Sequence, residues 1–390
     1  MKCDRCEGVP AARIALFVLL LAVVSGCRPE PGRGASAGSS GDTLPVPAIP
    51  YAPRGYVCCR TAEGLTVDGR LEEAAWRQAR WTELFTDIEG DRKPAPRFRT
   101  RAKMLWDSTC FYIGAELAEP HVWATLTRRD AVIYHDNDFE VFIDPDADTH
   151  EYYELEVNAL NTVWDLLLLK PYRDGGPAVN AWDIAGLQTA VAVEGTLNDP
   201  SDVDSGWRVE IAIPWAVLAE CAHRPSPPRE GDRWKVNFSR VEWQVEARDG
   251  VYAKVTDPAT GRPLPEDNWV WSPQGLIAMH YPEMWGLVQF SAAPPGSPEA
   301  ALVADPADSA RWALRQVYYA ERNYQAAHGR FTAAHSDLAL ETAAPRGFTW
   351  PPALRATEDR FEAEVVRRDG GGALRITEDG RTAPTGQAGG

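Results

Sequence analysis

The chain has 390 residues, a formal charge of −16 and a hydrophobic share of 44%. The excess of acid argues against nucleic acid and against an anionic lipid surface as partners. The hydrophobic share is typical of a globular protein, and fifteen tryptophans favour a ligand-binding role, because Trp often stacks on flat ligands.

The N-terminus carries a short apolar run, IALFVLLLAVV, that ends in Val24-Ser25-Gly26-Cys27. The run is too short to span a membrane as a mature helix, and its small terminal residues are typical of a secretory signal. A Cys at this point resembles the bacterial lipobox, which implies cleavage before Cys27 and lipidation of that residue. A plain signal peptide with an incidental Cys is the alternative.

We therefore predict a lipoprotein signal peptide over residues 1–27 and a flexible Pro/Gly/Ser tether over 28–55. The protein would be lipid-anchored outside the cytoplasm, with the lipid on Cys27 as its only membrane contact. Arg28 follows the Cys where an Asp would retain a lipoprotein at the inner membrane, so the resemblance implies the outer membrane in a Gram-negative cell.

Residues 56–290 are predicted to be nearly all β, with many short strands separated by Gly, Pro, Asp and Asn. This spacing favours a mainly β fold built as a two-sheet antiparallel β-sandwich. The prediction assigns four tryptophans of these segments to the core: Trp76, Trp207, Trp215 and Trp271.

Two successive predicted strands, in DNDFEVFIDPD and EYYELEVN, alternate apolar residues with carboxylates. Such a face could meet water, grip a polar ligand, hold a metal or cut a glycosidic bond, which needs a pair of carboxylates. Calcium prefers hard oxygen ligands, and we name four candidate ligands for a structural calcium ion: Asp136, Asp138, Asp144 and Asp146.

Several stretches in order resemble carbohydrate-binding module family 9 and its lipoprotein relatives over about residues 56–290: TVDGRLEEAAW, MLWDSTCFYIGAEL, NDFEVFIDPD, EYYELEVNALNTVWD, GWRVEIAIPW, KVNFSRVEW and WSPQGLIAMHYPEMWG. The resemblance implies a two-sheet β-sandwich, calcium in some members, and sugar bound between two aromatic rings with polar side chains around it.

Carried over residue by residue, the resemblance makes Glu140 and Asn158 hydrogen-bonding residues and Tyr134 the first stacking ring. The second ring falls near Met279-His280, with Trp285 close by in sequence, and Glu156 stands where the family has a basic residue. From the alternation itself we add Trp164. By its residue type we also add Arg240 as a bidentate donor, with packing and an ion pair as the alternative for this residue. The predicted carbohydrate site is thus Tyr134, Glu140, Glu156, Asn158, Trp164, Arg240, Met279, His280 and Trp285.

Residues 291–390 are predicted to form a small α+β extension. Asp305-Pro306 is a favourable helix start, and FEAEVVRRDGGGALRITEDGR is typical of a β-hairpin. We find no catalytic residues in this part.

Taken together, these observations favour a cell-surface or periplasmic lipoprotein that binds a poly- or oligosaccharide without catalysis and supports carbohydrate catabolism. Two alternatives stay open: a glycan-processing hydrolase or a subunit of one, and a scaffold module that binds no sugar.

Overall fold

The computed structural model describes residues 43–298 and 301–385. The predicted signal peptide, the lipidation site Cys27 and residues 28–42 of the tether lie outside the described residues. No helix of the described ranges combines the length and the apolar character needed to cross a membrane.

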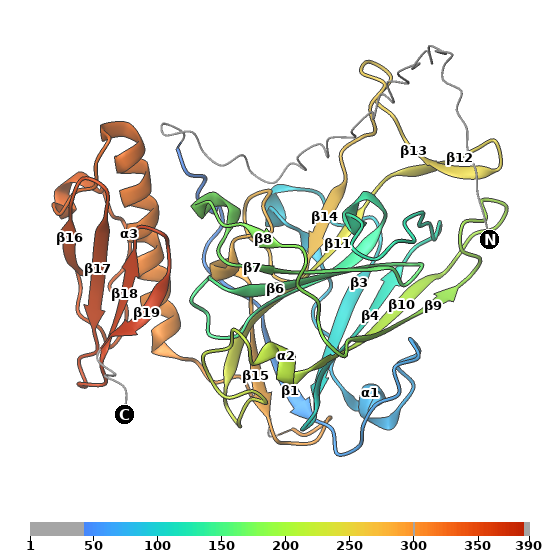
Figure 1. Ribbon diagram of the computed structural model, residues 1–390, viewed down its shortest axis with the longest axis horizontal. Coiled ribbons are helices and arrows are strands. Elements are labelled where there is room, and N and C mark those ends of the chain that lie inside the picture. The colour runs from blue at the N-terminus through green and yellow to red at the C-terminus, as the bar shows by residue number, and fades with distance from the viewer. Residues whose placement is uncertain (1–42, 299–300, 386–390) are drawn as a thin grey trace, which may run out of the picture. The chain divides into compact units, whose positions relative to one another are not determined.

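A continuous thirteen-stranded sheet forms most of the predicted sandwich (Figure 1), and it runs in the order β8-β7-β6-β5-β11-β15-β1-β3-β4-β10-β9. Off this path, β14 pairs with β11, and β2 pairs with β14. Its strands are β1 (Gly55–Arg60), β2 (Thr86–Asp87), β3 (Thr100–Trp106), β4 (Cys110–Ala118), β5 (Asp138–Asp144), β6 (Tyr152–Asn158), β7 (Val163–Leu168), β8 (Ala178–Val179), β9 (Gln188–Glu194), β10 (Gly206–Pro214), β11 (Arg233–Glu242), β14 (Asp267–Val270) and β15 (Gly286–Ser291).

The sheet doubles back on itself, so that its two halves act as the two layers of a sandwich. One core cluster joins Phe139 and Leu155 of the β5–β6 half to Ile113 and Trp207 of the β4–β10 half. The halves are continuous because β1 pairs in parallel with β15 on one side and with β3 on the other. The mainly β prediction is confirmed. The pairing of β1 with both halves could not be predicted, because local sequence patterns do not report which strands pair.

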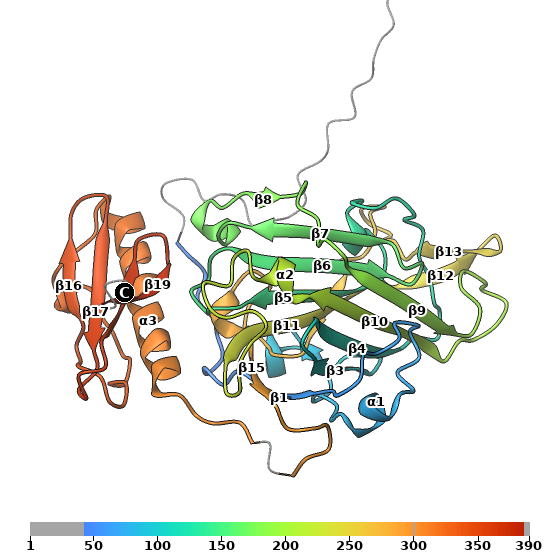
Figure 2. The ribbon, with the colours of Figure 1, turned by 60° about the horizontal axis from the view of Figure 1, so that its bottom comes forward.

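The alternation predicted for β5 and β6 is confirmed. Phe139, Val141 and Ile143 of β5 point into the core together with Tyr153 and the other odd-numbered residues of β6. The strands β7, β6 and β5 lie side by side (Figure 2), so their even-numbered residues form one continuous second face.

Short elements complete this part of the chain: the helices α1 (Ala74–Gln78) and α2 (Trp215–Leu218) and the hairpin β12 (Val245–Arg248) and β13 (Val251–Lys254). The four tryptophans predicted for the core are buried, as expected. The cysteines of the described residues are free: Cys58, Cys59, Cys110 and Cys221.

The C-terminal extension contains the long helix α3 (Pro306–His328) and a four-stranded antiparallel sheet of β16 (Ala353–Ala356), β17 (Phe361–Val366), β18 (Ala373–Thr377) and β19 (Thr382–Thr385). Asp305 caps α3 by accepting a 2.8 Å hydrogen bond from the N–H of Ala307, and Gly329 ends the helix in the left-handed conformation. The predicted helix and hairpin are confirmed, and two further strands widen the hairpin into a sheet.

Candidate functional site

The second face of β5, β6 and β7 gathers carboxyl groups. The register places Glu140 of β5 opposite Glu156 of β6, and Glu156 opposite Trp164 of β7. Asp138 and Glu154 lie on the same face, because they are two residues from Glu140 and Glu156 along their strands. We call Asp138, Glu140, Glu154 and Glu156 the carboxylate cluster.

The carboxylate cluster is buried. The exposed fraction is 0% for Asp138, 6% for Glu140, 5% for Glu154 and 1% for Glu156. The interpretation of these residues as a solvated sheet face is therefore wrong. The covering groups come from distant segments, including Trp285 and the partly buried Tyr172 and Met279, which pack over the same face.

The cluster is only partly hydrogen-bonded. The backbone N–H of Tyr134 donates to Glu156 Oε2 at 2.9 Å, and that of Val241 donates to Asp138 Oδ1 at 3.2 Å. Asp138 Oδ2 and Glu154 Oε2 have no hydrogen-bond partner within residues 43–298 and 301–385. One oxygen each of Asp138, Glu140 and Glu156 lie within 4.8 Å of one another.

The electrostatics of the cluster follow from burial without a compensating cation. Burial raises the pKa of Glu140 to about 7, and burial together with the charge of Glu140 raises the pKa of Asp138, Glu154 and Glu156 well above the usual carboxyl range. Within residues 43–298 and 301–385, no Lys, Arg or His forms a salt bridge with any of the four.

Two aromatic rings flank the cluster. Tyr134 and Trp164 are half-buried, and their ring centroids are 6.5 Å apart at an interplanar angle of 33°. Trp243 fixes the segment that carries Tyr134 by donating from its indole N–H to the Tyr134 carbonyl at 2.8 Å. Tyr172 is a third ring packed on this face, which the sequence analysis missed, and burial and then the charges of Glu154 and Glu156 raise its pKa.

The predicted second stacking position lies at the other end of the same face. His280 Nδ1 is 2.9 Å from the hydroxyl of Tyr152, and its ring meets that of Tyr172 edge-on at 4.5 Å. Burial, followed by the nearby Arg173, lowers the pKa of His280 to about 3, so the imidazole is neutral at physiological pH. Trp285 is fully buried against Phe142, which makes it a packing residue with no face open for a ligand.

Asn158 is on the predicted face, but its amide group is occupied. Its Nδ2 donates to the Leu126 carbonyl at 2.8 Å and to Asp136 at 3.0 Å, while its Oδ1 accepts from the N–H groups of Leu160 and Thr162. The side chain therefore orders the neighbouring loops, and no donor or acceptor is left over for a ligand.

Arg240 is on the opposite face of β11, away from the carboxylate cluster. Its guanidinium contacts Glu119 at 2.6 Å and Glu242 at 2.8 Å, and all three side chains are buried. The structure thus separates Arg240 from the other predicted site residues. A signal for this was present, because Trp234, Val236 and Phe238 precede it at a spacing of two and all face the core.

The four aspartates proposed as calcium ligands do not form one site. Asp138 belongs to the carboxylate cluster, and the Asp136 carboxylate accepts hydrogen bonds from Thr125, Leu126 and Asn158. Asp144 and Asp146 come together with Asp148, with one oxygen of each within 4.8 Å of the others.

The Asp144–Asp146–Asp148 loop fits a cation only in part. Its hard oxygens suit calcium, but both oxygens of Asp144 accept backbone N–H groups, from Ala147 and Thr149 at 2.9 Å. Asp148 is moreover paired with Arg381 of the extension at 2.7 Å. Calcium at this loop stays a prediction.

Helix α3 bonds to the two short loops that carry Tyr172 and His280. Arg322 contacts Asp174 at 2.6 Å, and Arg173 contacts Glu283 at 2.8 Å. Tyr319 donates to Glu283 as well. Burial raises the pKa of Glu283, but the charges of Arg173 and then Arg315 outweigh burial and lower this pKa to about 2. The extension therefore holds the covering segments of the carboxylate face through a buried ionic network.

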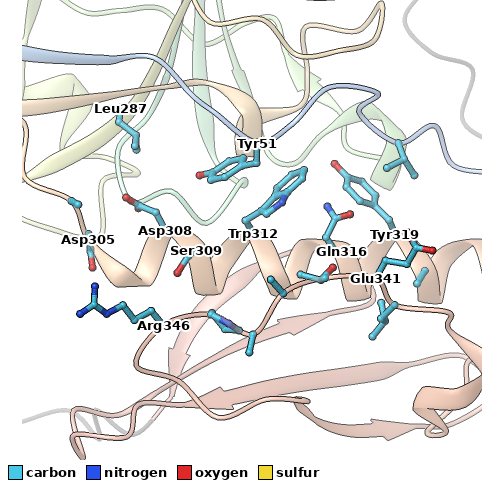
Figure 3. Close-up of a pocket in the computed structure, with 18 of the residues that line it drawn as sticks. Tyr51, Leu287, Asp305, Asp308, Ser309, Trp312, Gln316, Tyr319, Glu341 and Arg346 are labelled. Carbon is cyan, nitrogen blue, oxygen red and sulfur yellow. The ribbon is translucent and has the colours of Figure 1, made fainter.

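A separate open groove of about 1070 Å³ lies along α3 and the segment 338–346. Tyr51 and Trp312 stack on each other at its wall, with centroids 4.6 Å apart and an interplanar angle of 10° (Figure 3). Each ring thus covers one face of the other. Arg233 and Gln316 also line the groove, and their Nε, Nη1 and Nε2 atoms have no hydrogen-bond partner among the described residues.

The fold and the carboxylate face together define a mainly β module with a polar, aromatic-flanked site on one sheet. Residues 67–231 match the family model described as carbohydrate family 9 binding domain-like. The resemblance stated in the sequence analysis is confirmed for that segment, which contains the carboxylate cluster, Tyr134 and Trp164.

Solved structures similar to the chain include a carbohydrate-binding module of family 9 from Caldicellulosiruptor kristjanssonii. Its complex with cellotriose is 14% identical, covers 65% of this chain and 100% of its own, and has a TM-score of 0.40. Its complex with glucose is 15% identical, covers 62% of this chain and 99% of its own, also with a TM-score of 0.40. The search of curated proteins gave no match.

Proposed function

We propose that this protein binds carbohydrate without catalysis on the face of β5, β6 and β7, as a lipid-anchored protein outside the cytoplasm that supports carbohydrate catabolism. The observation that carries the proposal is the placement of two partly exposed rings, Tyr134 and Trp164, beside buried carboxyl groups with unused oxygens. Carbohydrate sites combine aromatic surface for the C–H face of a sugar with a few polar groups for its hydroxyls. The family match over residues 67–231 supports the same role.

The arrangement of the carboxyl groups favours binding over hydrolysis. A glycosidase places its two carboxyl groups on either side of the scissile bond. Here Asp138, Glu140 and Glu156 occupy neighbouring positions on one face of two paired strands. They therefore meet a ligand from one side, which suits recognition of hydroxyl or amine groups.

The test is calorimetry of the soluble chain with a panel of mono- and oligosaccharides. We expect Tyr134→Ala and Trp164→Ala each to weaken the binding of the best ligand by about fivefold or more, which corresponds to about 1 kcal/mol of lost stacking. Trp312→Ala is the matched control, because it removes a half-buried ring from the separate groove.

Equal binding by the wild type and both site variants would move the sugar site elsewhere. A Trp312→Ala variant that alone loses affinity would assign the sugar to the groove along α3. If no saccharide binds at millimolar concentration, the proposed function is wrong and the scaffold alternative replaces it.

A further inference from the structure

We infer that the sugar recognised on this face carries a protonated amine, and that the ammonium group is held by Asp138, Glu140 and Glu156 with Glu154 beside them. The inference rests on the proposed function, since it names the ligand class of the same site. It starts from a contrast between this cluster and the other buried acidic groups of the molecule.

Several other buried carboxylates are paired with cations of the chain, whereas Glu210 and Glu321 are single buried carboxyls that accept hydrogen bonds from N–H groups instead. Glu119 and Glu242 share Arg240, and Glu283 pairs with Arg173. Asp174, whose side chain is fully buried, pairs with Arg322. Burying an ionised carboxylate is strongly unfavourable unless it is paired, so these arginines are what the fold requires.

The carboxylate cluster has no such arginine or lysine among the described residues, although it gathers four acidic groups. Two of its oxygens, Asp138 Oδ2 and Glu154 Oε2, are buried and have no hydrogen-bond partner in the part of the chain that the structure describes. Unpartnered buried oxygens on a face flanked by two rings indicate that the missing donors come from a ligand. The missing charge indicates that this ligand is a cation.

An ammonium group fits the spacing of the cluster. It offers three N–H donors, which form charge-assisted bonds of about 2.8 Å to carboxylate oxygens. Three oxygens arranged tetrahedrally around one nitrogen at that distance lie about 4.6 Å apart. The nearest oxygens of Asp138, Glu140 and Glu156 lie within 4.8 Å of one another.

A neutral sugar would satisfy the hydrogen bonds but would not stabilise the ionised form of the buried carboxyl groups, which an ammonium group does. It would also remove the remaining solvent contact of Glu140 and Glu154, the two cluster members with 6% and 5% exposure. The rings of Tyr134 and Trp164 add to the preference for a cation, because an aromatic face attracts positive charge. The sugar body and its amine are thus recognised by neighbouring parts of one face.

The experiment compares three β-1,4-linked disaccharides by calorimetry near neutral pH with EDTA present: cellobiose, the unacetylated glucosamine disaccharide and its fully N-acetylated form. All three share the linkage and differ in the group at C2 of each ring. We expect the amine-bearing disaccharide to bind at least about tenfold more tightly than cellobiose. The N-acetylated form, which has lost its charge, should bind no more tightly than cellobiose.

Glu154→Gln tests the assignment within the cluster, because Glu154 carries an unpartnered oxygen and its removal leaves no buried cation behind. This variant should reduce the ratio of the affinity for the amine-bearing disaccharide to that for cellobiose by about threefold or more, because Gln keeps an acceptor for a hydroxyl and loses the charge that attracts an ammonium group. Glu116→Gln is the control, since Glu116 is partly exposed and pairs with Arg101 at the surface. Its amine preference should equal that of the wild type.

Cellobiose that binds as tightly as the amine-bearing disaccharide would overturn the inference and leave the proposed function standing. If none of the three disaccharides binds, both the inference and the proposed function are overturned. Calcium is titrated separately, without EDTA or sugar. If it binds to the wild type but not to Glu140→Gln, the cluster is a metal site and the amine assignment is overturned. A preference for the amine that survives Glu154→Gln unchanged would also overturn it, because the charge recognition would then lie elsewhere.

Discussion

Replacing Glu140 by Gln should stabilise the fold at alkaline pH although it damages the site. Burial raises the pKa of Glu140 from 4.5 to about 7, against a lowering by the Ser239 hydroxyl. The charged groups that face it are acidic: Asp138 on its own strand, Glu156 and Glu154 on β6, and Glu266. The folded state therefore holds a proton that the unfolded chain releases.

The sign of the pH effect follows from this difference in bound protons. Between pH 4.5 and about 7 the unfolded chain binds fewer protons at this position than the folded protein, so the free energy of unfolding falls as pH rises. Each pKa unit corresponds to about 1.4 kcal/mol, and the shift therefore costs the wild type about 3 kcal/mol above the folded pKa. Gln has a similar shape and cannot ionise, so Glu140→Gln escapes this loss.

Urea unfolding followed by tryptophan fluorescence measures the effect. At about pH 8.5 we expect Glu140→Gln to exceed the wild type by up to about 3 kcal/mol, and at about pH 4 the two proteins should be equally stable. Glu116→Gln, at a partly exposed ion pair, should change stability by less than about 1 kcal/mol. A Glu140→Gln variant without extra stability at alkaline pH would refute the reasoning, because the carboxylate would then have a compensating partner.

Three further outcomes are expected. Arg240→Met leaves Glu119 and Glu242 buried without a cation, so it should lower the free energy of unfolding in urea titrations by about 3–5 kcal/mol. A loss below about 1 kcal/mol would contradict the ion-pair assignment. If the Asp144–Asp146–Asp148 loop binds calcium, calcium should raise the melting temperature of the wild type and not that of Asp146→Asn. A melting temperature that changes neither with EDTA nor with added calcium would show that this loop binds no calcium. Cys27→Ser should shift the protein from the membrane fraction to the soluble fraction, and a variant that still sediments with membranes would contradict lipid anchoring.

The faces of β5 and β6 could be predicted from the sequence because the side chains of a strand alternate with a period of two. The same rule predicts the side of Trp164, although a turn at residues 159–162 and the separate strand β7 carry it there. Whether the carboxylate face meets water could not be predicted. Tyr172 and the segment around Trp285 cover it, and no local pattern near residues 138–156 reports their position.

The misplaced residues have specific physical reasons. Asn158 has the right position on the strand, but its amide is occupied by a loop that lies 32 residues earlier in the sequence, at Leu126. Arg240 was grouped with the site by residue type, whereas the period of its own strand assigns it to the core face. The metal candidates were grouped by closeness in sequence, and the extended strand between Asp138 and Asp144 separates them into two clusters.

A crystal structure of the protein soaked with the glucosamine disaccharide or with cellobiose tests the central claim most directly. We predict a sugar ring against Tyr134 or Trp164, with a sugar nitrogen or oxygen at hydrogen-bond distance from Glu140. A sugar bound instead in the groove beside Trp312, with the face of β5, β6 and β7 unchanged and empty, would contradict the account.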